Sequence, residues 1–247
     1  MILCLETSTP VCSVALCGKN GPVALKESSE DKSHASSLTV FIQELLSGAG
    51  IRAADLEAVA VSKGPGSYTG LRIGVSTAKG IAYGASIPLI GVETTLSMFH
   101  GITEDIRNKY GLDDTSLLVP MLDARRMEIY YSILTTGGNT VREITAEIIG
   151  EQSFSDIPES TRMLLFGDGA SKCRGILKRD NIVFADEFMI SAAYMYKPAF
   201  KAFEERQFED VAYFEPFYLK DFITSRPKKI SLAGNLTVNY RVYKEKT

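Results

Sequence analysis

The amino-acid sequence predicts an α/β protein built from two lobes with a similar order of elements. Short apolar runs alternate with segments whose apolar residues recur at helical spacing, as expected for strands followed by helices. Three strands, a helix, a strand, a helix and a strand fill the first part of the chain, and three strands open a second series near residue 116. With 247 residues, 45% of them hydrophobic, the chain can bury one or two cores of ordinary size.

Local patterns define the first lobe. Apolar runs at 2–5, 12–17 and 23–27 indicate strands, and Lys19-Asn20-Gly21 suits the reversal between the last two. The further elements predicted for this lobe are a helix capped by Ser33 and closed by Gly48 and Gly50, a strand at 59–61, a helix over 71–85, a strand at 88–92 and a helix from 94 to about 107.

The second lobe repeats the three opening strands but is poorer in helical segments. Strands are predicted at 116–122, 128–134, 141–149, 163–166 and 182–185, with helices after Gly169 and from about 191 to 205. This order is that of a ribonuclease H-like unit, and two such units facing each other describe the actin-like kinase and Hsp70 superfamily, which holds nucleotide phosphates between two hairpins. The shortage of helices predicts an abridged second lobe whose nucleotide-binding side is incomplete.

Three regions are therefore assigned: an N-terminal ribonuclease H-like lobe at 1–108, a C-terminal ribonuclease H-like lobe at 109–225, and a polar tail at 226–247. The formal net charge of −3 argues against a chain that holds nucleic acid on its own surface. The four cysteines show no CxxC spacing and are expected to be buried, reduced thiols. Because no apolar run approaches about 18 residues, we expect a cytoplasmic protein that does not enter a membrane.

The stretch from Val59 to Gly84 carries the most informative motif. Its strand breaks at Gly64-Pro65-Gly66 and restarts as a helix, with Ser67 able to cap the first turn. Such a loop can direct free backbone N–H groups at an anion, although its spacing matches neither a P-loop nor a dinucleotide fingerprint. A tight turn between strand and helix is the simpler alternative.

This motif also carries a resemblance. GPGSYTGLR, the opening MILCLETST and the later LDARR resemble the TsaB (YeaZ) family of bacterial proteins of tRNA threonylcarbamoyladenosine biosynthesis. The likeness spans most of the chain and is strongest in its first half. It implies a non-catalytic paralogue of TsaD that binds and stabilises TsaD, which transfers the threonylcarbamoyl group to the adenosine beside the anticodon of ANN-decoding tRNAs.

Partners and cofactors follow from the same resemblance. The ATPase TsaE would act on the TsaD heterodimer, the tRNA would be held mainly by other subunits of the complex, and the isolated protein would be a candidate homodimer. No cofactor of its own is implied, but ATP or ADP could lie at the partner interface. A stand-alone small-molecule kinase or ATPase of the actin-like superfamily is the alternative function, with Glu6, Asp123 and Asp168 as its working carboxylates.

A metal site is not expected. TsaD carries two histidines one helical turn apart after the strand that follows the GPG helix, and this spacing puts both imidazoles on one helix face. The corresponding stretch here is GVETTLSMF, so Glu93 and Ser97 stand in their place. The two histidines of this chain, His34 and His100, lie in different segments. For the same reason no catalytic residue is assigned.

The polar residues at strand ends have two alternative roles. Glu6 and Asp123 each end the first strand of a lobe, where they could face a nucleotide or simply brace a hairpin, the role that we favour. Asp168 could contact a ribose or cap the next helix, and the Thr7–Thr9 turn could bind phosphate or form an ordinary turn. The candidate nucleotide or anion contacts are Thr7, Ser8, Thr9, Gly64, Gly66, Ser67, Asp123 and Asp168.

The helix over 71–85 also suggests an interaction surface. It is apolar on nearly every side and carries Gly74, Ala78 and Ala82 at four-residue spacing, which permits close approach of a second helix. The resemblance implies that the first two helices form a four-helix bundle with the same pair of TsaD or of a second copy. The candidates for core or partner interface are Leu38, Phe41, Ile42, Leu45, Leu71, Gly74, Val75, Ala78 and Ala82.

Overall fold

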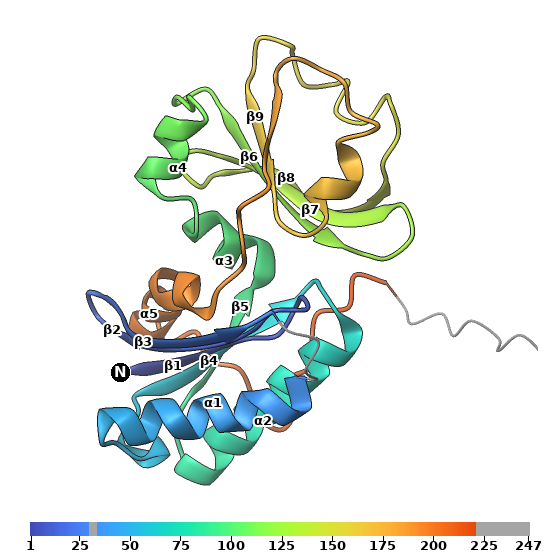
Figure 1. The fold of residues 1–247 in the computed structure, drawn as a ribbon. Coiled ribbons are helices and arrows are strands. Elements are labelled where there is room, and N and C mark those ends of the chain that lie inside the picture. Colours follow the sequence, from blue (N-terminus) through green and yellow to red (C-terminus); the bar gives the residue numbers. More distant parts are fainter. Residues whose placement is uncertain (30–33, 221–247) are drawn as a thin grey trace, which may run out of the picture.

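The computed structural model describes residues 1–29 and 34–220 and contains two five-stranded sheets, one in each lobe (Figure 1). The first sheet has the order β3-β2-β1-β4-β5, with β1 antiparallel to β2 and parallel to β4. Its strands are β1 (Ile2–Glu6), β2 (Cys12–Gly18), β3 (Gly21–Ser28), β4 (Ala58–Gly64) and β5 (Leu89–Glu93).

The second sheet repeats this topology in the order β10-β9-β6-β7-β8. Its strands are β6 (Leu117–Asp123), β7 (Glu128–Thr135), β8 (Thr140–Ile148), β9 (Met163–Phe166) and β10 (Ile182–Ala185). In each lobe the first three strands form an antiparallel meander, and the fourth and fifth add in parallel on the other side of the first. The predicted fold class, two ribonuclease H-like lobes with an abridged second lobe, is confirmed.

Helices α1 (His34–Ala49) and α2 (Tyr68–Ala85) lie side by side on one face of the first sheet, with the short 3-10 helix η1 (Ala53–Asp55) between them in sequence (Figure 1). Strand alternation explains the two-sided core. Leu3 and Leu5 of β1 pack under these helices, whereas Ile2 and Cys4 face the opposite side. The cap predicted at Ser33 and the tail predicted at 226–247 lie outside the described residues.

The helix predicted from 94 to about 107 is two helices, α3 (Thr94–His100) and α4 (Glu104–Lys109). The chain turns at Gly101, and Thr103 restarts it because its Oγ1 accepts a hydrogen bond from the Ile106 N–H at 3.4 Å. Helix α3 lies between the two sheets (Figure 1), where Met98 packs against apolar residues of the second lobe. The helix predicted after Gly169 is only a 3-10 turn, η2 (Ala170–Cys173).

The last described part of the chain returns to the first lobe, which differs from the predicted boundary of 109–225. The 3-10 helix η3 (Ala192–Met195) and α5 (Tyr196–Glu204) cover the face of the first sheet opposite α1 and α2. Residues 208–220, here called the strap, then run along β5, where the Glu209 N–H donates to Leu89 O at 2.8 Å. Residues 192–204 therefore bury the second face of the first sheet.

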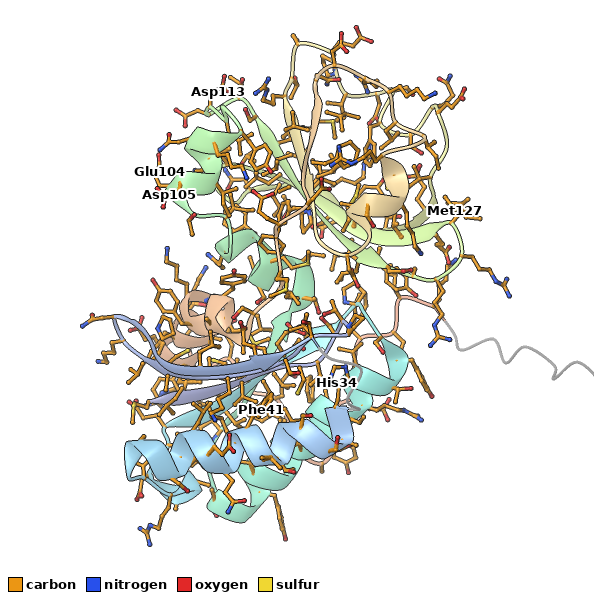
Figure 2. All side chains as sticks on the ribbon, in the orientation of Figure 1. His34, Phe41, Glu104, Asp105, Asp113 and Met127 are labelled. Carbon is orange, nitrogen blue, oxygen red and sulfur yellow. The ribbon has the colours of Figure 1, made fainter. Side chains whose placement is uncertain are left out.

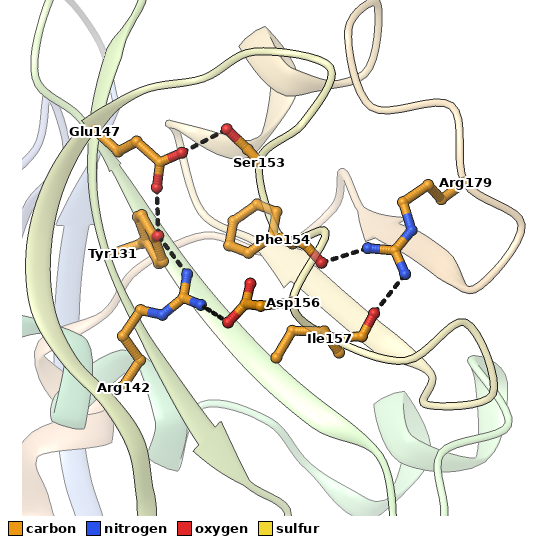
Figure 3. A network of polar contacts seen from close by, with 8 residues as sticks. All are labelled: Tyr131, Arg142, Glu147, Ser153, Phe154, Asp156, Ile157 and Arg179. Carbon is orange, nitrogen blue, oxygen red and sulfur yellow. Dashed lines mark hydrogen bonds and ion pairs between the residues drawn. The ribbon is translucent and has the colours of Figure 1, made fainter.

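An irregular segment, residues 149–162, covers the outer face of the second sheet in place of a helix, and a polar network fixes it (Figure 3). Tyr131 Oη donates to Glu147 at 2.5 Å and accepts from Arg142 at 2.8 Å, and Arg142 also reaches Asp156 at 2.5 Å. Arg179 donates to the carbonyl oxygens of this segment. Because Tyr131 is buried, these bonds satisfy polar atoms inside the lobe.

Two further expectations concern the whole chain. The four cysteines are free and buried, as predicted. Over residues 1–29 and 34–220, none of the helices combines the length and the apolar character that crossing a membrane requires.

Candidate functional site

The GPG loop and the Thr7–Thr9 turn are packed against each other at the ends of β4 and β1. The Ser67 N–H donates to Ser8 O at 2.6 Å, and Thr7 Oγ1 donates to Gly70 O at 2.8 Å. Ser67 caps α2 as predicted, accepting from the Gly70 N–H at 3.3 Å. The three residues of the turn are buried. The two motifs therefore fasten the start of α2 to the end of β1.

Close approach explains the glycines of this motif. A Cβ added to Gly70 would lie 2.0 Å from Thr7 O, and one added to Gly66 would lie 2.5 Å from Ser8 O. Gly66 and Gly64 also have positive φ values, of 156° and 119°. The Ser67 N–H that was a candidate anion donor is used inside the chain. A nucleotide contact by Thr7, Ser8, Thr9, Gly64, Gly66 or Ser67 stays a prediction, which this packing does not favour.

Glu6 lies in the interior beside this junction and is fully buried. Its Oε1 accepts hydrogen bonds from the Ser8 N–H at 2.7 Å and from Ser62 Oγ at 2.9 Å, whereas Oε2 has no partner among the described residues. Burial raises the pKa of Glu6, and the hydrogen bonds from Ser8, Ser62 and Thr7 offset part of that rise. No cation is paired with the carboxyl group in the part of the chain that the structure describes.

Glu93 and Ser97, the residues predicted to stand in place of the TsaD histidines, differ in burial: Glu93 is half-buried and Ser97 is buried. Glu93 accepts a hydrogen bond from Thr95 Oγ1 at 2.7 Å, and Ser97 is fully buried on α3. His34 contacts Thr9 O at 2.8 Å from the start of α1, and His100 ends α3. Within the described ranges, no group of three His, Cys, Asp or Glu residues could hold a metal ion.

Asp123 and Asp168 meet in the second lobe, at the base of the hairpin that joins β6 to β7. The Asp123 N–H donates to Asp168 Oδ1 at 3.0 Å, and Lys172 forms an ion pair with Asp123. Asp123 in turn accepts from the Arg125 N–H at 2.5 Å. Both aspartates thus brace the hairpin, the role favoured from the sequence for Asp123. None of the hydrogen bonds or ion pairs of the described residues links them to Glu6.

The hairpin loop contains residues that the sequence analysis did not single out. Arg125 and Arg126 both have left-handed backbones, with φ values of 67° and 54°, and both are exposed. Lys172 donates a hydrogen bond to Arg126 O at 2.8 Å and so holds the loop against the second lobe. Met127 follows at the rim of the second lobe, 45% exposed (Figure 2). The LDARR motif contains both arginines, but nothing in its letters predicts their backbone conformation.

A hollow of about 310 Å³ lies between the lobes, lined by Lys63, Glu93, Glu143, Ile144 and Phe217. The strap closes one side of it, because the Phe217 N–H donates to Lys63 O at 2.6 Å. Its volume is at the lower limit of small-molecule sites. None of the residues proposed as nucleotide contacts lines it.

The predicted interface residues on α1 and α2 face the interior of the first lobe rather than solvent. All of them except Phe41 are buried in this chain, and several belong to the core under the first sheet. Phe41 is partly buried and points from α1 toward the sheet (Figure 2). The exposed outer positions are different ones, among them Val40 (47% exposed) and Tyr83 (81% exposed). Burial therefore leaves the predicted set as support for an outer face rather than as the face itself.

The strap also contacts α2. Arg72 lies over the Tyr68 ring at 4.4 Å from its centroid and donates to Tyr218 Oη at 3.2 Å, and the two tyrosine rings are 5.1 Å apart. Lys79 donates to two strap carbonyl oxygens, those of Ala212 at 3.2 Å and Phe214 at 3.0 Å. The two cations of α2 are thus engaged on its strap side.

Comparison with known proteins gives a consistent result. A profile of the TsaD family, described as tRNA N6-adenosine threonylcarbamoyltransferase, matches residues 27–155. The chain is 29% identical over 229 residues to the tRNA threonylcarbamoyladenosine biosynthesis protein TsaB of Escherichia coli, covering 89% of this chain and 94% of that protein. It is 30% identical over 188 residues to TsaB of Buchnera aphidicola subsp. Schizaphis graminum, covering 73% of this chain and 82% of the relative.

Solved structures agree at the level of the fold. The solved structure of YeaZ from Pseudomonas aeruginosa superimposes with a TM-score of 0.73 at 22% identity, over 88% of this chain and 99% of that one. Sequence profile, relatives and fold thus point the same way, and the chain belongs to the TsaB (YeaZ) family, within the wider group that the TsaD profile describes.

Proposed function

We propose that this chain is a non-catalytic subunit of the machinery that makes threonylcarbamoyladenosine in tRNA, and that it binds and stabilises TsaD through the outer face of α1 and α2. Its relatives carry the name of that pathway. TsaD would perform the transfer to the adenosine beside the anticodon. TsaE, and ATP or ADP at the boundary of the heterodimer, belong to the same proposal.

The absence of charge on the α1–α2 face is the observation that carries the proposal. Helix α1 has one charged residue, Glu44, which pairs with Lys26 of β3. Helix α2 has two, Arg72 and Lys79, and both are engaged with the strap. Helix faces in contact with water are normally charged or polar. The outer face is almost uncharged and exposes Val40 and Tyr83 among neutral polar residues such as Thr39, Gln43 and Ser76, which suits it to cover by another protein.

Room for a partner helix exists on the same face. Gly80 and Gly84 are exposed on α2, and a Cβ added to either would meet no atom within 4 Å. Small residues at this spacing allow two helix axes to approach closely. A symmetrical pairing of two copies would use the same surface, so a homodimer and the TsaD heterodimer would exclude each other. The enclosed Glu6 and the engaged Asp123 support a scaffold more than a kinase.

The decisive variant is Gly80→Arg. Within this chain the new side chain enters open space and relieves the helix of a glycine, so the fold should be as stable as before or more so. A partner helix at this point would be excluded. Glu204→Arg on α5, on the opposite face of the first sheet, is the matched control. Size exclusion with light scattering would measure the mass of each variant alone and mixed with TsaD from the same source.

We expect wild type and Glu204→Arg to form a heterodimer and Gly80→Arg to remain separate from TsaD. A heterodimer formed equally well by Gly80→Arg would contradict the proposed surface. If the wild type ignored TsaD but bound ATP and magnesium by itself, the stand-alone kinase or ATPase would replace the scaffold.

A further inference from the structure

The β6–β7 hairpin loop, the strap and the start of α2 are linked by contacts among cations and tyrosines, with the carboxylates of Asp123, Glu128 and Glu215 beside them. Arg72 contacts Tyr68 and Tyr218. Lys220, two residues after Tyr218 in the strap, forms an ion pair with Glu128 at the base of the hairpin. We call this surface the cationic strip; it consists of Tyr68, Arg72, Arg125, Arg126, Lys172, Tyr218 and Lys220. The strap, which carries Tyr218 and Lys220, runs from beside α2 toward the second lobe (Figure 1).

We propose that the cationic strip binds the sugar-phosphate backbone of RNA. The inference rests on the proposed function, in which the substrate is a tRNA. It adds a contact surface on this subunit, which the overall negative charge of the chain had argued against. RNA recognition commonly combines arginines that contact phosphates with aromatic rings on which bases stack.

Arg125 and Arg126 are the arginines of the strip that are available for a ligand. The side chains of Arg125 and Arg126 have no hydrogen bond or ion pair among the described residues, and Arg72 donates to the hydroxyl of Tyr218 rather than to a carboxylate. The neighbouring carboxylates are occupied: Lys172 holds Asp123 and Lys220 holds Glu128. Glu215, which also lines the hollow of about 200 Å³ between α2 and the strap, acts on Arg72 only at a distance.

The backbone at Arg125 and Arg126 gives an independent reason to assign them a role. Left-handed conformations are unfavourable for side chains with a Cβ, and glycine or asparagine would suit both positions better. The loop is held there by hydrogen bonds from the Arg125 N–H to Asp123 and from Lys172 to Arg126 O. Two unpaired arginines kept in a strained, braced and exposed loop are typical of side chains that act on something outside the chain.

The charge distribution favours RNA over an acidic protein partner. The strip consists of cations and tyrosines, and the exposed large apolar side chains next to them in sequence are Met127 of the loop and Phe217 of the strap, which come from different segments. A protein interface would need an apolar centre. A polyanion needs only spaced cations and stacking surfaces.

The test uses the double variant Arg125→Asn/Arg126→Gly. It removes two charges and two strained side chains but keeps both bracing hydrogen bonds, because these use backbone atoms on the loop side. The matched control is Lys201→Asn/Arg206→Gly at the end of α5, which also removes two exposed cations, one of them at a left-handed φ of 56°. Arg125→Lys/Arg126→Lys keeps the charge.

Each variant would be titrated against a labelled tRNA transcript, in complex with TsaD and as the full chain alone, over salt concentrations from about 50 to 200 mM. For Arg125→Asn/Arg126→Gly we expect affinity to fall roughly tenfold and the slope of log K against log salt to flatten by about 1 to 2. Urea unfolding should show equal or higher stability. The lysine variant and the α5 control should bind within about threefold of wild type.

Unchanged affinity and slope in Arg125→Asn/Arg126→Gly would overturn the inference, whether or not the heterodimer forms. Loss of TsaD association in this variant, with RNA binding by the chain alone unchanged, would also overturn it and make the strip a protein contact. Since heterodimer formation by the wild type is measured separately, a failure of the scaffold proposal is distinguishable from a failure of this one.

Discussion

Glu6 offers a direct test of the structure of the first lobe. Its carboxyl group is fully buried, two hydrogen bonds reach Oε1, and Oε2 has no partner among the described residues. Because burial raises the pKa of Glu6, the folded chain holds this proton more tightly than the unfolded chain does. The contribution of Glu6 to stability is therefore greatest below the pKa of the unfolded chain and is lost as pH rises through the pKa of the folded one.

The magnitude follows from proton linkage. Between the two pKa values one proton separates the folded from the unfolded state, so the free energy of unfolding falls by up to about 1.4 kcal/mol for each pH unit. The lack of a partner for Oε2 leads to an estimate of similar size, because a buried polar atom without a hydrogen bond destabilises the folded state by about 1–3 kcal/mol. Glu6→Gln keeps the shape and the acceptor oxygen for Ser8 and Ser62 but has no charge to bury.

Urea unfolding of wild type and Glu6→Gln at several pH values from about 5 to 9 would measure this. We expect Glu6→Gln to gain on wild type steadily as pH rises, whereas Glu204→Gln, which removes an exposed charge, should show no such trend. The comparison cancels the histidines, including His100, whose pKa burial and Lys197 lower to about 4. A difference between Glu6→Gln and wild type that stays constant with pH would refute the reasoning.

Two further substitutions test the packing. Gly70→Ala places a Cβ 2.0 Å from Thr7 O and should lower the free energy of unfolding by about 1–3 kcal/mol. Gly80→Ala in the same helix meets open space and should raise the free energy of unfolding by about 0.5–1 kcal/mol. Equal effects of the two variants in urea unfolding would contradict the close approach of α2 to the Thr7–Thr9 turn. Tyr131→Phe removes the hydroxyl between Arg142 and Glu147 and should cost about 1–2 kcal/mol, with much less effect when Arg142→Met is already present, as a double-mutant cycle would show.

Much of the fold could be predicted from the sequence because its signals are local. Strand alternation, the cap at Ser67 and the apolar spacing of α1 and α2 depend on residues close in sequence, and each was found near its predicted place. The break between α3 and α4 was missed because the apolar pattern continues across Gly101 while the cap at Thr103 interrupts it. The pattern reports apolar spacing, and Ile106 of α4 packs, partly buried, against the same core as Met98 of α3.

The return of the chain to the first lobe could not be predicted in the same way. Helix α5 has an apolar face that any sheet could cover, and only the three-dimensional arrangement shows that the face of the first sheet opposite α1 and α2 lacks other cover. The sequence could not separate core residues from partner-interface residues for a related reason. Ala78 and Ala82 have the small-residue spacing of a helix contact, but they contact their own lobe, and Gly80 between them faces outward.

The glycines of the GPG motif show why a loop of this kind is ambiguous in a sequence. A glycine gives room where another group must approach the backbone, and the sequence does not say whether that group is a phosphate or another part of the chain. Here Ser8 O approaches Gly66, Thr7 O approaches Gly70, and the strap carbonyl of Phe217 approaches Gly64. The motif thus joins β1, α2 and the strap at one point. Displacing the strap from Gly64 would disturb the start of α2 and, with Tyr218 and Lys220, the link to the second lobe. The GPG motif therefore connects, through packed contacts, the helix on which we propose that a partner sits with the cationic strip that we propose binds RNA.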